Sequence, residues 1–217
     1  MIDAKRLLDQ LVGSGVAGGL AGGLAGGALA KVLSGKKGRK LAGSALKVGG
    51  LALVGGLAYK AWRNHQQGAG QPLPQSPRAV ALPPAGSAFL PREDDRAGTS
   101  ALSLLLARAM ISAAKADGQI DTHESQGILN QINGLDLPSD DKAFLFEEYG
   151  RPLDIAGLAR DVDSPEHAAE VYTAAALMVE PPSPPERIFL DTLARALGLE
   201  GGLAQKIQAT VAANRLG

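Results

Sequence analysis

Hydrophobic residues recur every three to four positions along the C-terminal half of the chain, which is the spacing of one face of an α-helix. Four such runs follow one another from Thr99 onward, and no alternating strand pattern competes with them. Prolines at 138, 152, 165 and 181–185 separate the runs. The runs comprise Leu102, Leu105, Leu106, Ala109, Met110 and Ala113; Ile128, Leu129 and Ile132; Val171, Ala174, Ala175 and Met178; and Ile188 or Phe189, Leu193, Ala196 and Leu197. The pattern predicts an all-α domain of six or seven helices over residues 99–217, large enough for a hydrophobic core.

The N-terminal part of the chain shows a different pattern, with long uncharged runs that are rich in glycine. Residues 12–30 carry no charge, and of these 19 positions eight are Gly, five are Ala and five are Val or Leu. A helix of this length spans about 28 Å, close to the roughly 30 Å hydrocarbon core of a bilayer. The length therefore permits a membrane span, but the low hydrophobicity makes insertion depend on a packing partner.

Residues 41–59 supply such a partner, because they contain seven Leu or Val and only one charge, Lys47, whose long stem can reach the membrane interface. A basic turn at 34–40 joins the two runs. The sequence thus predicts a helical hairpin in which small residues let the two helices pack closely within a membrane. The predicted packing residues are Gly15, Gly19, Gly23, Gly27, Gly49, Gly50, Gly55 and Gly56.

Two other interpretations of the glycine-rich part stay open. It could be a flexible low-complexity tail, or residues 41–62 alone could span the membrane while the first run packs on its surface. Tyr59 and Trp62, which lie beside Lys60 and Arg63, fit a membrane-interface anchor, and the alternative is an ordinary solvated aromatic pair.

Six prolines among Gln, Gly, Ala and Ser indicate a semi-flexible tether over residues 64–98. The predicted organisation is therefore a membrane-anchoring hairpin at 1–63, a linker at 64–98 and an acidic helical domain at 99–217.

Charge divides the chain in the same way. Residues 1–92 hold 12 Lys or Arg against 2 Asp, a balance of +10, whereas residues 93–217 hold 10 against 20, a balance of −10. The basic residues flank apolar runs without interleaved aromatic residues, so nucleic-acid binding is not expected. The absence of cysteine excludes disulfides and thiolate metal sites, and no nucleophile elbow or phosphate loop is present. We expect no enzymatic activity and assign no catalytic residue.

An acidic turn, KADGQIDTHE at 115–124, is the strongest candidate for chemistry. It places Asp117, Asp121 and Glu124 between two predicted helices, and carboxylates are preferred ligands of Ca²⁺ and Mg²⁺. An EF-hand is excluded, because the position twelve residues along the loop holds Ile128. The competing interpretation is a capping box, with Asp121 as N-cap and Glu124 three residues later.

A second possible capping box occurs at SPPE, where Ser183 is the N-cap before Pro184 and Glu186 can close the box. The helices that follow the two turns, ESQGILNQINGLDL and ERIFLDTLARALGL, have similar apolar spacing. This similarity suggests an internal duplication of a unit made of a helix, an acidic turn and a second helix.

The DGQIDTHE turn, the later PPERIFLDTLARALGL and the glycine-rich N-terminal segment together resemble the YebE-type inner-membrane proteins of unknown function, whose C-terminal half is similar to the tellurite-resistance TerB-like domain. The resemblance implies an all-helical fold with two related halves and a metal site shared by their acidic turns. On this sequence the ligands of a divalent cation, Ca²⁺ or Mg²⁺, would be Asp117, Asp121, Glu124 and Glu186. The second turn departs from the pattern, since EPPSPPE stands where a second Asp-Gly would be expected.

These observations predict a non-enzymatic, membrane-anchored module of the bacterial inner membrane that recruits a protein partner or senses stress. Its expected partners are membrane lipid, further copies of the chain through the glycine faces, and an unidentified protein bound by the helical domain. The alternative function is a self-assembling, glycine-packed protein that perturbs or permeates the membrane. The side of the membrane that holds residues 99–217 stays open, because basic residues occur at the turn and at both ends of the hairpin.

Overall fold

The computed structural model of the chain describes residues 2–13, 49–67, 82–84, 87–92, 94–116, 132, 133, 135, 137–179 and 181–215. All regular secondary structure in these residues is helical, which confirms the predicted all-α class. The helices are α1 (Ala4–Gly13), α5 (Gly50–Gln66), α6 (Arg96–Ala114), α8 (Ser139–Gly150), α9 (Ile155–Arg160), α10 (Pro165–Met178), α11 (Pro184–Ala196) and α12 (Gly201–Arg215).

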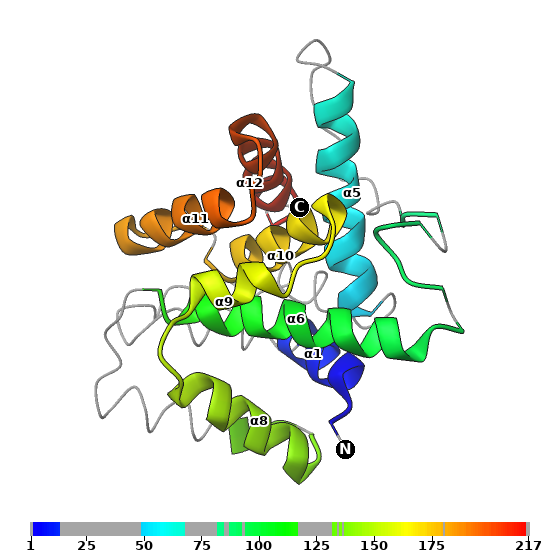
Figure 1. Cartoon of the computed structure of the whole chain (residues 1–217), viewed down its shortest axis with the longest axis vertical. Coiled ribbons are helices and arrows are strands. Elements are labelled where there is room, and N and C mark those ends of the chain that lie inside the picture. The colour runs from blue at the N-terminus through cyan, green and yellow to red at the C-terminus, as the bar shows by residue number, and fades with distance from the viewer. Residues whose placement is uncertain are drawn as a thin grey trace.

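Helix α10 lies at the centre of the fold and contacts α6, α5, α11 and α12. Figure 1 shows α6 crossing the middle of the molecule, with α10 and α12 on one side of it and α8 on the other. Ten of the fourteen residues of α10 are buried, and five of these ten are alanines. A helix that is apolar all round belongs in a core, and its small side chains let neighbouring helices approach closely.

The N-terminal helix α1 is part of the same core. Leu7, Leu8 and Leu11 are fully buried, and α1 packs against both α6 and α5. These leucines recur at the i, i+1, i+4 spacing of a helix face, whereas the polar residues of α1 face outward.

Helix α5 takes up the second half of the predicted membrane run and continues into the predicted tether as far as Gln66. It packs against α1, α10 and α12, and its residues 53–58 are all buried. Phe89, within the predicted tether, is also buried. Parts of the predicted hairpin and tether thus pack on the helices of 99–217, because their Leu, Ala and Phe side chains can be removed from water there.

Several helix ends follow the local rules for capping. The Asp95 carboxylate accepts a hydrogen bond from the Gly98 amide at 2.8 Å and so starts α6 three residues before Thr99. The capping box predicted for Ser183 and Glu186 is confirmed at the start of α11. Gly198, with φ of 65°, follows the end of α11 in the left-handed conformation that glycine adopts most readily.

Among the helices of the described residues, α6 alone is long and apolar enough to cross a membrane. Half of its most apolar stretch is buried in the bundle, and a core helix has the same length and composition, so this is weak evidence. Helix α6 coincides with neither predicted span. The first span, 12–30, begins inside α1, whose Val12 packs against the core, and its residues 14–30 lie outside the described residues. The second span overlaps α5.

Candidate functional site

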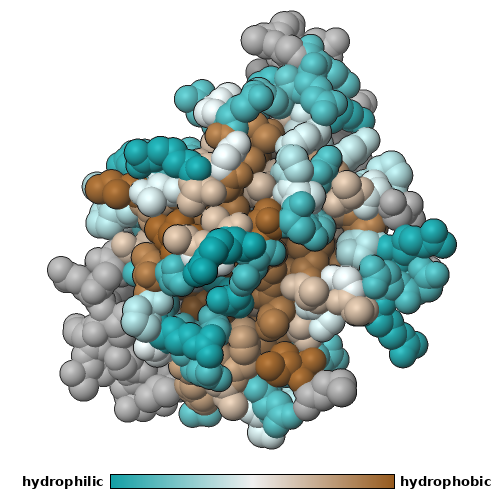
Figure 2. All heavy atoms as spheres, in the orientation of Figure 1, coloured by the Kyte–Doolittle hydropathy of each residue, from teal (hydrophilic) through white to brown (hydrophobic). Residues whose placement is uncertain are grey.

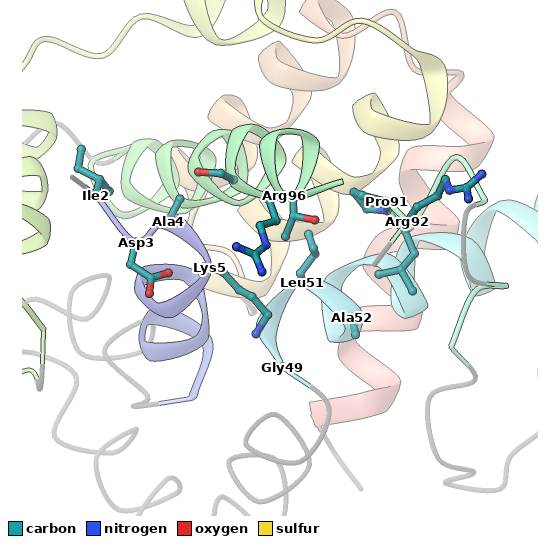
Figure 3. Close-up of a pocket in the computed structure, with 13 residues that line it drawn as sticks. Ile2, Asp3, Ala4, Lys5, Gly49, Leu51, Ala52, Pro91, Arg92 and Arg96 are labelled. Carbon is teal, nitrogen blue, oxygen red and sulfur yellow. The ribbon is translucent and has the colours of Figure 1, made fainter. Parts of the chain in front are cut away.

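A cavity of about 670 Å³ opens where α1, α5 and α6 begin (Figure 3). A short segment, Leu90–Arg92, closes its remaining side. Its walls are apolar in part and carry basic side chains. The lining residues are Ile2, Asp3, Ala4, Lys5, Gly49, Leu51, Ala52, Leu90, Pro91, Arg92, Arg96, Thr99 and Ser100.

Two basic side chains define the chemistry of this cavity. Figure 3 shows Lys5 of α1 and Arg96 of α6 pointing into the space between α1 and the start of α5, whereas the Arg92 guanidinium points away. Lys5 forms an exposed ion pair with Asp9 at 2.9 Å. Within the described residues Arg96 forms no ion pair, so its guanidinium is available to an anionic ligand.

The walls are held in place by side-chain bonds to the backbone. The Asp9 carboxylate accepts a hydrogen bond from the Gly50 amide at 2.6 Å and so joins α1 to the first turn of α5. Gly49 precedes that turn with φ of 81°, which favours glycine. On the other side, the Asp3 amide donates to the buried carboxylate of Asp141 at 2.9 Å, which fixes the start of α1 against α8.

The amino-terminal ends of three helices also meet at the cavity, since its lining includes residues of the first turns of α1, α5 and α6. Each of these ends already carries a carboxylate: Asp3 accepts from the Arg6 amide at 3.1 Å, Asp9 accepts from the Gly50 amide and Asp95 accepts from the Gly98 amide. These carboxylates offset the partial positive charge of the helix ends. The groups that favour an anionic ligand are therefore the side chains of Lys5 and Arg96, with apolar walls beside them.

A buried carboxyl group lies elsewhere in the core. Glu170 of α10 is fully buried, and neither of its carboxyl oxygens has a hydrogen-bond partner in the described part of the chain. Burial, with a smaller contribution from the charge of Glu166, raises the pKa of Glu170 to about 9. The side chain is therefore protonated at neutral pH. It faces Gly55 of α5, at which an added Cβ would lie 2.9 Å from its Oε1.

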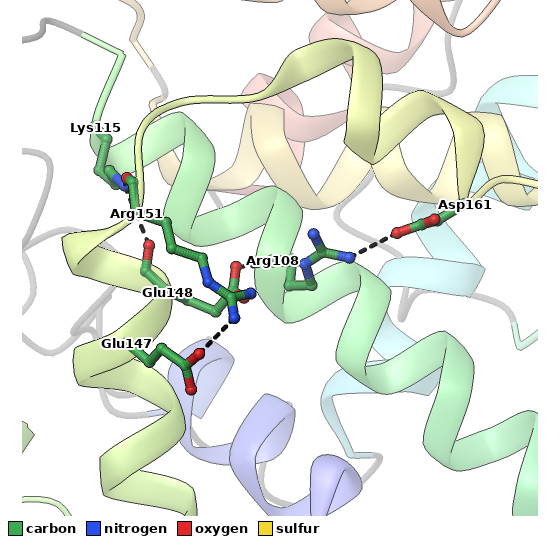
Figure 4. Close-up of polar contacts among 6 residues, drawn as sticks. All are labelled: Arg108, Lys115, Glu147, Glu148, Arg151 and Asp161. Atoms are coloured by element: carbon green, nitrogen blue, oxygen red, sulfur yellow. Dashed lines mark hydrogen bonds and ion pairs between the residues drawn. The ribbon is translucent and has the colours of Figure 1, made fainter.

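A polar cluster ties α6 to α8 and α9 (Figure 4). Arg108 of α6 donates to the carboxylates of Asp161, at 2.6 Å, and Glu148, at 3.3 Å. Arg151 pairs with Glu148 and Glu147 at the end of α8. These contacts link three helices, and Arg108 and Glu148 are only partly exposed, so we interpret the cluster as structural.

Lys115, the first residue of the KADGQIDTHE stretch, extends this cluster. Its Nζ donates to the backbone carbonyls of Glu148, at 3.1 Å, and Arg151. Burial lowers the pKa of Lys115, although the nearby Glu148 carboxylate opposes this effect. The ammonium group thus caps carbonyls at the end of α8 and fixes where the chain enters the turn.

The predicted metal ligands fall mostly outside the described residues, since Asp117, Asp121 and Glu124 are not among them. Glu186 is described, and its Oε2 accepts a hydrogen bond from the Ser183 amide at 2.6 Å. Within the described ranges, no group of three or more His, Asp or Glu side chains could hold a metal ion. A Ca²⁺ or Mg²⁺ site that includes the acidic turn stays a prediction.

The capping role of Glu186 leads to a test that separates it from metal binding. Glu186→Ala should lower the free energy of unfolding of the full-length chain by about 1 kcal/mol, because the Ser183 amide loses its acceptor. Glu186→Gln should retain most of the stability, since glutamine also closes a capping box. Thermal unfolding with Ca²⁺ or Mg²⁺ provides the comparison: a cation-dependent rise in melting temperature that Glu186→Gln removes would show a ligand role instead.

The predicted packing glycines are only partly described. Gly15, Gly19, Gly23 and Gly27 lie outside the described residues, and Gly49 precedes α5 instead of lying on its face. An added Cβ would lie 3.0 Å from the Leu8 carbonyl oxygen at Gly50, and 2.6 Å from the Phe89 carbonyl oxygen at Gly55. Gly56 is buried. The described glycines thus pack against α1, α10 and the segment at Phe89.

Tyr59 and Trp62 also contact this segment. Both rings make T-shaped contacts with the Phe89 ring, with centroid distances of 5.5 Å for Tyr59 and 5.7 Å for Trp62. Each aromatic side chain is half-buried and packs against the core. A role as membrane-interface anchor stays a prediction.

Lys5, Arg96 and Glu170 were not recognised as site residues from the sequence. The available signals were the excess of basic residues in 1–92 and a single acid within the apolar run AAEVYTAAALM. Neither signal shows which side chains meet, because Lys5 and Arg96 come from distant parts of the chain.

The chain belongs to DUF533, a family of proteins of unknown function, whose family model matches residues 18–211. It is similar to a Yersinia enterocolitica protein described as an uncharacterised protein in the ampR 5′ region. The two are 27% identical over 111 residues, which cover 48% of this chain and 80% of the relative. No solved structure gives a significant match.

Proposed function

We propose that the chain is a non-enzymatic, membrane-associated helical module whose cavity between α1, α5 and α6 binds an anionic lipid headgroup. The observation that carries the proposal is the convergence of Lys5 and Arg96 on an apolar-walled cavity. Arginine suits this role, because its guanidinium can bind two phosphate oxygens at once. Ile2, Leu51 and Leu90 offer apolar surface to the part of the lipid that follows the phosphate.

The position of the cavity along the chain supports a location at the membrane surface. Gly49 lines the cavity, so the glycine-rich segment that ends at residue 48 joins the helical body directly beside it. If the segment that follows α1 inserts into the bilayer, the cavity is held close to the headgroups. The resemblance to YebE-type inner-membrane proteins with a TerB-like half supports the same arrangement, with the acidic helical body free to recruit a protein partner.

Vesicle binding by the full-length chain tests the proposal. We expect tighter binding to vesicles of phosphatidylcholine with 30% phosphatidylglycerol than to phosphatidylcholine alone, as measured by co-sedimentation. Arg96→Glu should remove much of this difference, because a basic residue at an anionic surface contributes about 1 kcal/mol and its reversal costs more. The difference should also shrink in high salt, which screens exposed charges.

Arg187→Glu is the matched control. Arg187 is exposed on α11, and it does not line the cavity, so its reversal makes the same change in net charge. Equal losses in the two variants would indicate attraction through net charge and would contradict a site at Arg96. Recovery of the intact chain in the soluble fraction of cells without detergent would contradict membrane association itself.

A further inference from the structure

A second cavity, of about 730 Å³, lies on a different face of the molecule. It is bounded by the end of α5, the connection between α9 and α10, and the connection between α11 and α12. Figure 2 shows hydrophobic residues in a band over the middle of the face between α5 and the helices α9 and α11, with hydrophilic residues on either side. The cavity is formed by Trp62, His65, Gln66, Ala159, Val162, Asp163, Ser164, Pro165, Ala168, Ala196, Leu197, Gly198, Leu199, Glu200 and Leu203.

The walls of this cavity are fixed by contacts within the chain. The His65 Nε2 and a Glu200 carboxylate oxygen lie 2.9 Å apart and link the end of α5 to the start of α12. Lys206 of α12 donates to the Asn64 carbonyl at 2.6 Å and strengthens the same link. At Gly198 the chain makes a tight turn after α11, in which the Leu199 amide donates to the Ala194 carbonyl at 2.9 Å. The cavity is therefore largely preformed.

The charged groups of the cavity are acidic. Asp163 and Glu200 are its two carboxylates, and no lysine or arginine belongs to the lining. The two side chains are 77% and 80% exposed, so they stand at the rim with most of their oxygen surface open to solvent. Glu200 contacts His65, whereas Asp163 contacts His167 and also the Ser164 side chain. A carboxylate accepts more than one hydrogen bond, so both retain capacity for a cationic donor.

Trp62 gives the cavity an aromatic wall. Its ring is half-buried and packs edge-on against Phe89, with an interplanar angle of 69°. Val162, Leu197 and Leu203 add aliphatic surface. The tryptophan ring and the aliphatic side chains together can remove an apolar stem from water.

We propose that this cavity binds a small organic cation, with an ammonium or guanidinium group on a short apolar stem. The cationic group lies at the rim between Asp163 and Glu200, and the stem lies along Trp62. The volume falls within the range of small-molecule sites, about 300–1,000 Å³. A bare metal ion fits the site poorly, because most of the wall is apolar and no cluster of three metal-ligating side chains occurs in the described ranges.

Trp62 supplies a direct readout, since it is the only tryptophan of the chain. The full-length protein is titrated with three probes that share one stem: hexylammonium, hexanol and hexanoate. We expect hexylammonium to change the Trp62 emission in a saturable way, with an affinity at least tenfold higher than that of hexanol, and hexanoate to bind least. Isothermal titration calorimetry checks that the emission change reports binding. Equal binding of hexylammonium and hexanol would overturn the assignment of a cation site.

The carboxylates are tested by Asp163→Asn combined with Glu200→Gln. We expect this double variant to lose the preference for hexylammonium over hexanol while it still binds the neutral probe. Asp191→Asn is the control, because Asp191 is exposed on α11 and does not line the cavity. Thermal unfolding verifies that all variants are folded. A preference for the cation that survives in the double variant would contradict the proposal, as would the absence of any saturable response to hexylammonium. Neither result bears on vesicle binding, which depends on Lys5 and Arg96.

Discussion

Glu170→Gln should abolish most of the loss of stability that the full-length chain undergoes as the pH rises from 5 to 8. In the folded chain the pKa of Glu170 is raised from 4.5 to about 9, because its carboxyl group is buried. Between these two values the folded chain holds a proton that the unfolded chain has released. The free energy of unfolding therefore falls as the pH rises, by up to about 1.4 kcal/mol per pH unit. Over three units the upper limit is about 4 kcal/mol, a large part of the stability of an ordinary domain.

Glutamine has nearly the same shape as protonated glutamate and carries no titrating group. The variant should have a similar urea midpoint to the parent chain near pH 5 and a higher one near pH 8. Glu147→Gln, at an exposed carboxylate of α8, is the control for replacing a glutamate by glutamine outside the core. If the urea midpoints of the parent chain and of Glu170→Gln changed with pH in the same way, Glu170 would be ionised in the folded chain, or its burial would not persist in solution.

The helices that could be predicted best are those with a regular apolar face. Helices α6, α10 and α11 coincide with three predicted runs. Of the two alternative positions at the start of the last run, Phe189 is buried and Ile188 is exposed. The helical period determines this outcome, because residues three or four apart share one face. Helix α6 begins three residues before the predicted start at Thr99, because Asp95, which lies within the predicted tether, is its N-cap.

Helix α5 shows why the environment of a glycine-rich helix is harder to predict. Glycine and alanine allow close approach of helices in a protein core as well as in a bilayer, and leucine is apolar enough for both, so composition does not distinguish the two environments. The described residues place Gly50 and Gly55 against α1, Phe89 and Glu170, which are segments of the same chain. The identity of those neighbours depends on tertiary packing, which a local pattern does not contain.

The candidate sites were less predictable than the helices, because each joins segments that are far apart in sequence. Lys5 and Arg96 line one cavity only after α1 packs on α6, and Trp62 and Glu200 line the other only after α5 packs on α12. The capping box of Ser183 and Glu186 was predictable from the sequence, since its two side chains lie three residues apart and interact within one helical turn.

Gly55→Ala should destabilise the chain by about 1–3 kcal/mol, which is the usual cost of adding a methyl group to a well-packed core. The new Cβ would lie 2.6 Å from the Phe89 carbonyl oxygen and 2.9 Å from Glu170 Oε1. Phe89 is held between Tyr59 and Trp62, so its backbone cannot move away without disturbing both ring contacts. The close approach requires glycine at this position, although alanine has the higher helix propensity.

Gly201→Ala is the matched control, because Gly201 also lies in a helix and an added Cβ there would meet no atom within 4 Å. This substitution should leave the chain unchanged or stabilise it by up to about 1 kcal/mol, through helix propensity alone. Urea unfolding of the two full-length variants measures the contrast. If Gly55→Ala matched Gly201→Ala, Gly55 would face open space or lipid, and the packing of α5 against Phe89 and Glu170 would be wrong. A loss of stability confined to Gly55→Ala would instead support α5 as a core helix of the bundle, whose glycine makes room for the buried Glu170 carboxyl group.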